Sequence, residues 1–82
     1  MKAIVTVELK SAVLDPQGKA VEHSLNALGF PDVEDVRVGK VFRITLRDND
    51  EPREQIEQKI RQMCEKLLAN PVVENFSYTM DP

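Results

Sequence analysis

The spacing of apolar residues along the chain switches between two and about 3.6 residues, and this switching constrains the fold most. From Lys2 to Lys10 the odd positions are apolar, which predicts a half-buried strand. Asp15 followed by Pro16 predicts a helix start, because the carboxylate accepts from free amides and proline has no amide to satisfy. Apolar residues then follow at helical spacing until Gly29, which predicts the end of this helix.

The alternation of period two returns in the middle of the chain. Apolar residues alternate at positions 36 and 38 and again at 42, 44 and 46, and the pattern changes around Gly39 and Lys40. A glycine at such a change suits a tight turn, so we predict two antiparallel strands joined as a hairpin. A second helix is predicted from Glu51 or Pro52 to Ala69, and a last strand over residues 72–80.

The predicted order of elements is strand, helix, strand, strand, helix, strand. Right-handed crossovers then place two helices on one face of a four-stranded antiparallel sheet, which is the α+β, ferredoxin-like βαββαβ arrangement. We expect a single domain over residues 1–82. Its predicted core consists of Val5, Val7, Leu9, Val21, Leu25, Leu28, Val36, Val38, Phe42, Ile44, Leu46, Ile56, Ile60, Met63, Leu67 and Phe76.

Charge and size exclude several classes of protein. The net charge of -3 has the wrong sign for binding nucleic acid or an anionic membrane, and no apolar run approaches the roughly 20 residues of a membrane span. The single cysteine allows no disulfide within the chain, which favours a cytoplasmic location. A chain of this length buries only about 60% of its unfolded surface, so we expect a homodimer or a higher even oligomer.

The chain offers no evident catalytic group. His23 is the only histidine and Cys64 the only cysteine, and they lie on different predicted helices, so no nucleophile and base can be paired. The loop from Ser11 to Leu14 has no glycine to cradle a phosphate, and the predicted first and third strands lack the aromatic residues of an RNA-binding sheet. We therefore expect no catalytic, cofactor-binding or metal-binding residue in this chain.

Three segments go beyond generic patterning: VLDPQG at 13–18, VRVGK at 36–40 and MCEKLLAN at 63–70. Together, in this order and in a chain of this length, they resemble the PurS family, the small subunit of phosphoribosylformylglycinamidine synthase in purine biosynthesis. The resemblance implies a non-catalytic assembly subunit of an ATP-dependent amidoligase complex. In that complex a synthetase subunit would bind ATP and Mg, and a glutaminase subunit would release ammonia from glutamine. This chain would bridge the two during conversion of formylglycinamide ribonucleotide to formylglycinamidine ribonucleotide.

The first two segments supply the candidate contacts with partner subunits. Arg37 and Lys40 form a cationic pair in an acidic chain, and such a pair can bind carboxylates on another subunit. Asp15 and Pro16 would cap a helix in any protein, so their role in binding a partner is an additional hypothesis. The candidate partner interface consists of Asp15, Pro16, Gln17, Gly18, Arg37, Gly39 and Lys40.

A small-molecule-binding regulatory domain of the amino-acid-sensing type is the main alternative, because it shares the predicted order of elements. Its ligand usually lies at a subunit interface near a glycine-bearing first loop, and the segment from Ser11 to Leu14 has no glycine. A thermal-shift assay with a panel of amino acids would distinguish this class from an assembly subunit. A stand-alone acyl-phosphate hydrolase is a third class, and it lacks its phosphate cradle here.

Overall fold

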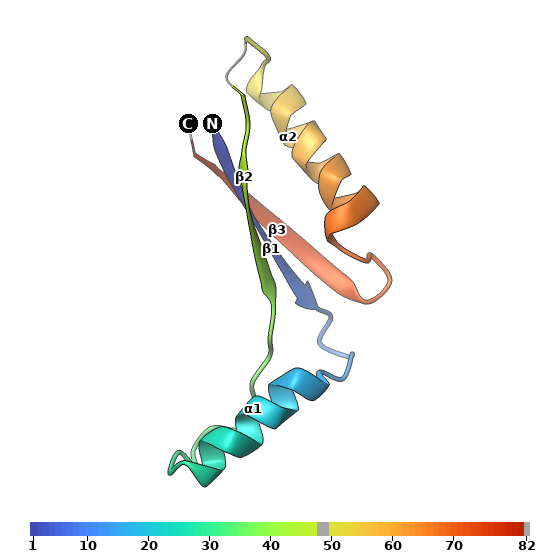
Figure 1. Cartoon of the computed structure of the whole chain (residues 1–82). Coiled ribbons are helices and arrows are strands. Elements are labelled where there is room, and N and C mark those ends of the chain that lie inside the picture. The colour runs from blue at the N-terminus through green and yellow to red at the C-terminus, as the bar shows by residue number, and fades with distance from the viewer. Residues whose placement is uncertain (48–49, 82) are drawn as a thin grey trace.

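The computed structural model of the chain, which describes residues 1–47 and 50–81, contains one three-stranded sheet and two helices (Figure 1). A single π-helical turn, η1, extends the second helix. The elements in chain order are β1 (Lys2–Leu9), α1 (Pro16–Ala27), β2 (Lys40–Thr45), α2 (Arg53–Met63), η1 (Cys64–Leu68) and β3 (Glu74–Asp81).

The sheet has the order β2-β1-β3, and both outer strands run antiparallel to β1. Val5 in the centre of β1 lies opposite Phe42 of β2 and Tyr78 of β3. The odd residues Ala3, Val5 and Val7 are fully buried, whereas the even residues of β1 point to the other face. The predicted alternation of the first strand is therefore confirmed.

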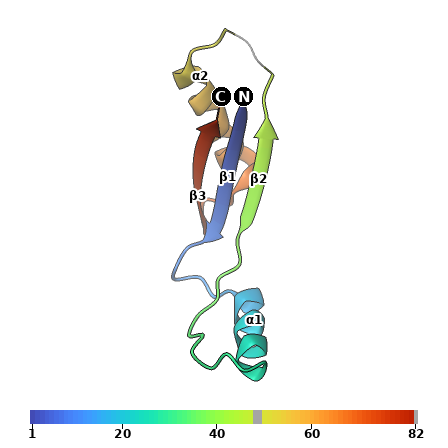
Figure 2. The same cartoon turned by 90° about the vertical axis from the view of Figure 1, so that its left-hand side faces the viewer.

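One face of the sheet is covered by α2 and η1, as Figure 2 shows with the helix behind the strands. Ile60 and Cys64 contribute the fully buried side chains of this layer, and Ala69 is buried just after it. Side chains from both outer strands pack around this centre. The partly buried members of the core are Phe42, Ile44, Leu46, Met63, Leu68, Phe76, Tyr78 and Met80.

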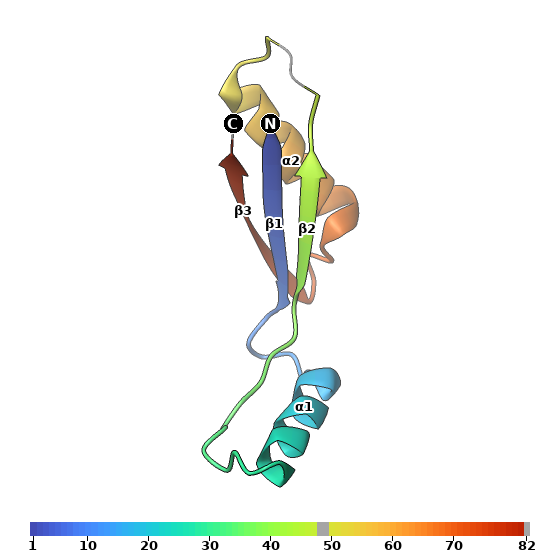
Figure 3. The same cartoon turned by 60° about the vertical axis from the view of Figure 1, so that its left-hand side comes forward.

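The predicted four-stranded, ferredoxin-like sheet with two helices on one face is wrong. Residues 36–39 are not part of a strand, and no tight hairpin forms at Gly39. The amide of Val38 instead donates to the side chain of Asp15, at the start of α1. This bond ties residues 36–38 to the helix, and α1 lies beyond the end of the sheet, which makes the molecule 53 Å long and 15 Å thin (Figure 3).

Three predicted core residues are exposed, for two different reasons. Val21 and Leu28 are 39% and 73% exposed because α1 has no sheet beneath it. Leu67 is 83% exposed because η1 has more residues per turn than an α-helix. The side chain that packs against the core after the buried Cys64 is therefore that of Leu68. The other predicted core residues are buried or half-buried.

The second helix otherwise matches its predicted extent, since α2 and η1 together span residues 53–68. Neither helix within the described parts of the chain combines the length and hydrophobicity that crossing a bilayer requires.

We predict that Ile60→Ala lowers the free energy of unfolding by about 2–5 kcal/mol, because Ile60 is fully buried between α2 and the sheet. Leu67→Ala, seven residues along the same helical segment, is the control and should change it by no more than about 0.5 kcal/mol. Urea unfolding followed by circular dichroism measures both. Equal losses for the two variants would contradict the burial pattern described above.

Candidate partner interface

The predicted interface residues come together where α1 begins. Asp15, Gly18 and Arg37 connect the start of the helix to residues 36–38, and we call these three residues the α1 clasp. Pro16 and Gln17 occupy the exposed first turn between them. Gly39 and Lys40 lie farther along the chain, against the end of β1.

Asp15 joins two segments that are 23 residues apart. Its Oδ1 accepts from the amide of Gly18 at 2.9 Å, which caps the helix, and its Oδ2 accepts from the amide of Val38 at 2.8 Å. The side chain is only 5% exposed. The amides of Val38 and Gly18, with the Arg37 guanidinium nearby, hold the pKa of the Asp15 carboxyl below its ordinary value. The carboxylate therefore stays ionised at neutral pH.

Arg37 binds the loop that leads into α1. One guanidinium nitrogen, Nη2, donates to the carbonyls of Lys10 at 3.0 Å and Val13 at 2.8 Å. Three elements of the chain thus meet at the clasp: the loop after β1, the start of α1 and the segment before β2. The sequence made Arg37 a candidate to bind carboxylates of another subunit, and within the chain its guanidinium donates to two backbone carbonyls.

Both interface glycines are required by close backbone approaches. A Cβ on Gly18 would lie 2.1 Å from the carbonyl oxygen of Val36, and one on Gly39 would lie 2.9 Å from that of Val7. Contacts this short are not available to any other residue without movement of the backbone. These glycines allow residues 36–39 to run tightly against α1 on one side and β1 on the other.

Lys40 forms an ion pair across the end of the sheet. Its Nζ lies 3.5 Å from Oε2 of Glu74, and Lys40 and Glu74 belong to the two outer strands on either side of β1. Because the lysine side chain is 57% exposed, this pair contributes little to stability. Within the chain, Arg37 therefore binds two backbone carbonyls, whereas Lys40 pairs with a carboxylate.

The orientation of α1 is a feature that sequence reasoning missed. The helix turns small and polar residues toward residues 33–36: Gly18 against the carbonyl of Val36, and Asn26 donating to the carbonyl of Val33 at 3.3 Å. Glu22, between them in the helix, is only 8% exposed. The apolar Val21 and Leu28 are left on the adjacent, uncovered side. The spacing of Gly18, Glu22 and Asn26 at every fourth position was the available signal.

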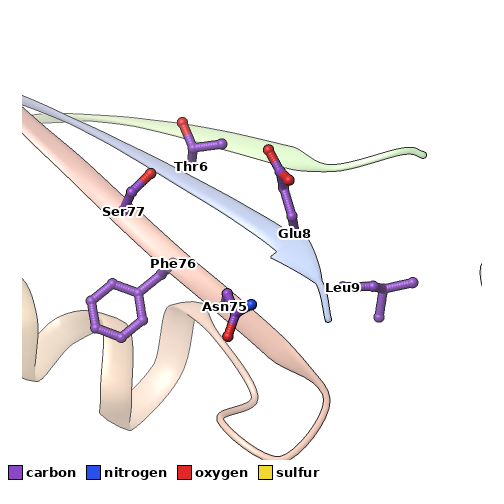
Figure 4. Close-up of a pocket in the computed structure, with 6 residues that line it drawn as sticks. All are labelled: Thr6, Glu8, Leu9, Asn75, Phe76 and Ser77. Atoms are coloured by element: carbon purple, nitrogen blue, oxygen red, sulfur yellow. The ribbon is translucent and has the colours of Figure 1, made fainter. Parts of the chain in front are cut away.

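A shallow hollow of about 160 Å³ lies on the uncovered face of the sheet (Figure 4). Thr6, Glu8 and Ser77 lie on this side of β1 and β3, while Phe76 points toward α2. His23, on α1, and the buried Cys64 do not line this hollow. Burial raises the pKa of the Cys64 thiol. No group of three metal-ligating side chains occurs among residues 1–47 and 50–81.

The lowered pKa of Asp15 predicts a specific dependence of stability on pH. Its contribution is fully present above the unfolded pKa, about 3.9, and is lost as the pH falls through the lower folded pKa. Asp15→Asn should therefore be less stable than the wild type at pH 7, and the difference should shrink below about pH 4. Urea unfolding between pH 2 and 7 measures it, with the exposed Asp32→Asn as control. A difference that is constant across this range would contradict the role of the carboxylate.

Comparison with known proteins adds independent evidence. The family described as "PurS: Phosphoribosylformylglycinamidine (FGAM) synthase" matches residues 2–82. A relative from Archaeoglobus fulgidus, the phosphoribosylformylglycinamidine synthase subunit PurS, is 48% identical over 94% of this chain and 94% of its own length.

Solved structures agree with the sequence relationship. The chain resembles PurS of Methanocaldococcus jannaschii, one of the subunits of formylglycinamide ribonucleotide amidotransferase in the purine biosynthetic pathway, with a TM-score of 0.81 and 37% identity, covering 95% of this chain and 92% of that one. It also resembles a chain in the structure of PurLQS from Thermotoga maritima, with a TM-score of 0.82 and 29% identity over 95% and 93% of the two chains. The chain belongs to the PurS family, the family of the PurS subunit of phosphoribosylformylglycinamidine synthase.

Proposed function

We propose that this chain is the non-catalytic assembly subunit of phosphoribosylformylglycinamidine synthase in purine biosynthesis, and that it bridges the synthetase and glutaminase subunits. The observation that carries this proposal is the position of α1. The clasp holds α1 beyond the end of the sheet, and the apolar side of this helix is exposed. Such a surface suits the joining of protein chains.

The chemistry of the reaction gives a bridging subunit a physical purpose. The glutaminase subunit releases ammonia from glutamine, and the synthetase subunit uses it on formylglycinamide ribonucleotide at the expense of ATP, with Mg bound there. Holding the two active sites together raises the effective concentration of ammonia at the second site. We assign no cofactor to this chain and place ATP and Mg in the synthetase subunit. The relationship to a chain of PurLQS supports assembly with further subunits.

We also propose that the chain is a homodimer, or a higher even oligomer, in the cytoplasm. The apolar side of α1 includes Val21 and Leu28, and Leu14 and Phe30 at its two ends are 70% and 52% exposed. A second copy presents the same unsatisfied surface, so that pairing about a two-fold axis buries both at once. The free, buried Cys64 is consistent with a reducing compartment.

The dimer proposal predicts that Leu28→Asp weakens self-association by at least roughly tenfold, because a carboxylate would replace an apolar side chain at the contact. Ala27→Asp is the matched control, since it places the same charge at the same helix end but on another side. Sedimentation equilibrium of the 9.3 kDa chain measures both dissociation constants. Unchanged association of Leu28→Asp would contradict a contact through α1.

The bridging role predicts an asymmetry between two nitrogen sources. In a reconstituted synthase, leaving out this chain should abolish glutamine-dependent synthesis of formylglycinamidine ribonucleotide and spare much of the activity supported by high external ammonium. Ammonia supplied in bulk bypasses the need to hold the glutaminase in place. Adding back Ala27→Asp should restore the glutamine-dependent rate better than adding back Leu28→Asp. Full glutamine-dependent activity in the absence of the chain would refute the bridge.

A further inference from the structure

The part of the chain around α1 does not share the apolar core of the sheet. Residues 11–39 comprise the loop after β1, α1 and the segment that leads to β2, and we call this part the α1 lobe (Figure 3). The core residues come from the strands, α2, η1 and the residues directly after them, and none comes from residues 11–39. The buried residues of the lobe are Asp15, Gly18 and Glu22, none of which has an apolar side chain. Burial of apolar surface therefore stabilises the lobe little.

The helix of the lobe is weak by itself. α1 has 12 residues, and isolated helices shorter than about 12–15 residues are marginally stable in water. Gly18, Ser24 and Asn26 disfavour the helix further, because these residue types have lower helix propensities than alanine. The helical state of α1 therefore depends on contacts with residues outside the helix.

Polar contacts hold the lobe closed. The amide of Val38 donates to Asp15, and Arg37 donates to the carbonyls of Lys10 and Val13. The two ends of the lobe are attached to the sheet by other contacts. The amide of Lys10 donates to the carbonyl of Val73 at 2.9 Å, and Gly39 lies against the backbone of β1. Breaking the clasp therefore leaves both ends of the lobe in place.

We propose that the α1 lobe opens and closes as one unit while the sheet and α2 stay folded, and that the α1 clasp keeps it closed. Opening breaks the bonds of Asp15 and Arg37 and removes the cap of the helix. The pairing of β1 with β2 and β3 lies outside the lobe and is retained. A unit of this kind opens at a lower free energy than the whole molecule unfolds.

The opening regulates any contact that α1 makes. A partner that recognises the closed lobe binds only the closed fraction of the chain, so its apparent affinity falls in proportion to that fraction. A change in the clasp then alters binding without altering the surface that the partner touches. This consequence rests on the proposed function. The opening itself does not, because it is a property of the chain alone.

Native-state hydrogen exchange, followed amide by amide with NMR, tests the opening. In the wild type, the amides of residues 20–27 and of Val38 should exchange at least roughly tenfold faster than the slowest amides of β1, after correction for intrinsic rates. Val38 is decisive because its acceptor is the carboxylate of Asp15, whereas the amide of a strand residue would be protected with the sheet. Protection of the Val38 amide equal to that of β1 would overturn the proposal.

Ile60→Ala separates the lobe from the sheet. Ile60 is buried in the core, which is intact in both the closed and the open form, so the exchange of α1 should change less than about twofold. The amides of β1 should exchange at least roughly tenfold faster, because global unfolding becomes easier. Should Ile60→Ala fold poorly, Ile60→Val gives the same comparison, with β1 faster by about threefold or more. Acceleration of α1 by the same factor as β1 would show one cooperative unit and overturn the proposal.

Asp15→Asn tests the clasp. An amide group in place of the carboxylate leaves one oxygen for two backbone donors, so the closed form loses stability and α1 should exchange at least roughly fivefold faster at pH 7. Asp32→Asn removes the same charge from an exposed position of the lobe and should change the rate less than about twofold. Unchanged exchange of α1 in Asp15→Asn would overturn the role of the clasp. All variants are measured at one protein concentration and without other subunits, so the outcome is independent of the bridging role.

Discussion

The shape of this molecule depends on the carboxylate of Asp15. The same side chain caps α1 through the amide of Gly18 and holds the amide of Val38, so the helix cannot tilt away from residues 36–38 without breaking one of the two bonds. Because the amide of Val38 is used here, it is not available to a sheet. Arg37 then fixes the preceding loop through the carbonyls of Lys10 and Val13. The elongated form follows from these few polar contacts rather than from a large core.

Much of the secondary structure could be predicted because it follows from local chemistry. The alternation in β1, the cap at Asp15 and the extent of the second helix each depend on residues close in sequence. The position of α1 depends instead on polar contacts with residues far away in the sequence, and the periodicity of a helix does not specify such contacts. Val36 and Val38 alternate like a strand, yet a carboxylate 23 residues earlier in the chain binds the amide that a strand would use. The prediction placed Leu67 in the core because the spacing of apolar residues does not reveal a π-helical turn.

The candidate interface stays a prediction as a surface that binds partner subunits. The structure does bring Asp15, Gly18 and Arg37 together from two distant segments. Their contacts, however, lie within the chain, as does the ion pair of Lys40 with Glu74. The first two segments that carry the family resemblance thus contain the residues that hold α1 beyond the end of the sheet.

The fully buried centre of this chain is small: it consists of Ala3, Val5, Val7, Ile60 and Cys64, with Ala69 nearly as deep. A core of this size leaves a narrow margin between the folded and unfolded states. Any chain that binds the folded form adds its binding free energy to that margin by mass action. A copy made in excess of its binding partners therefore spends more time unfolded, where proteases act on it. A core of this size therefore makes the stability of the folded chain depend on what binds to it.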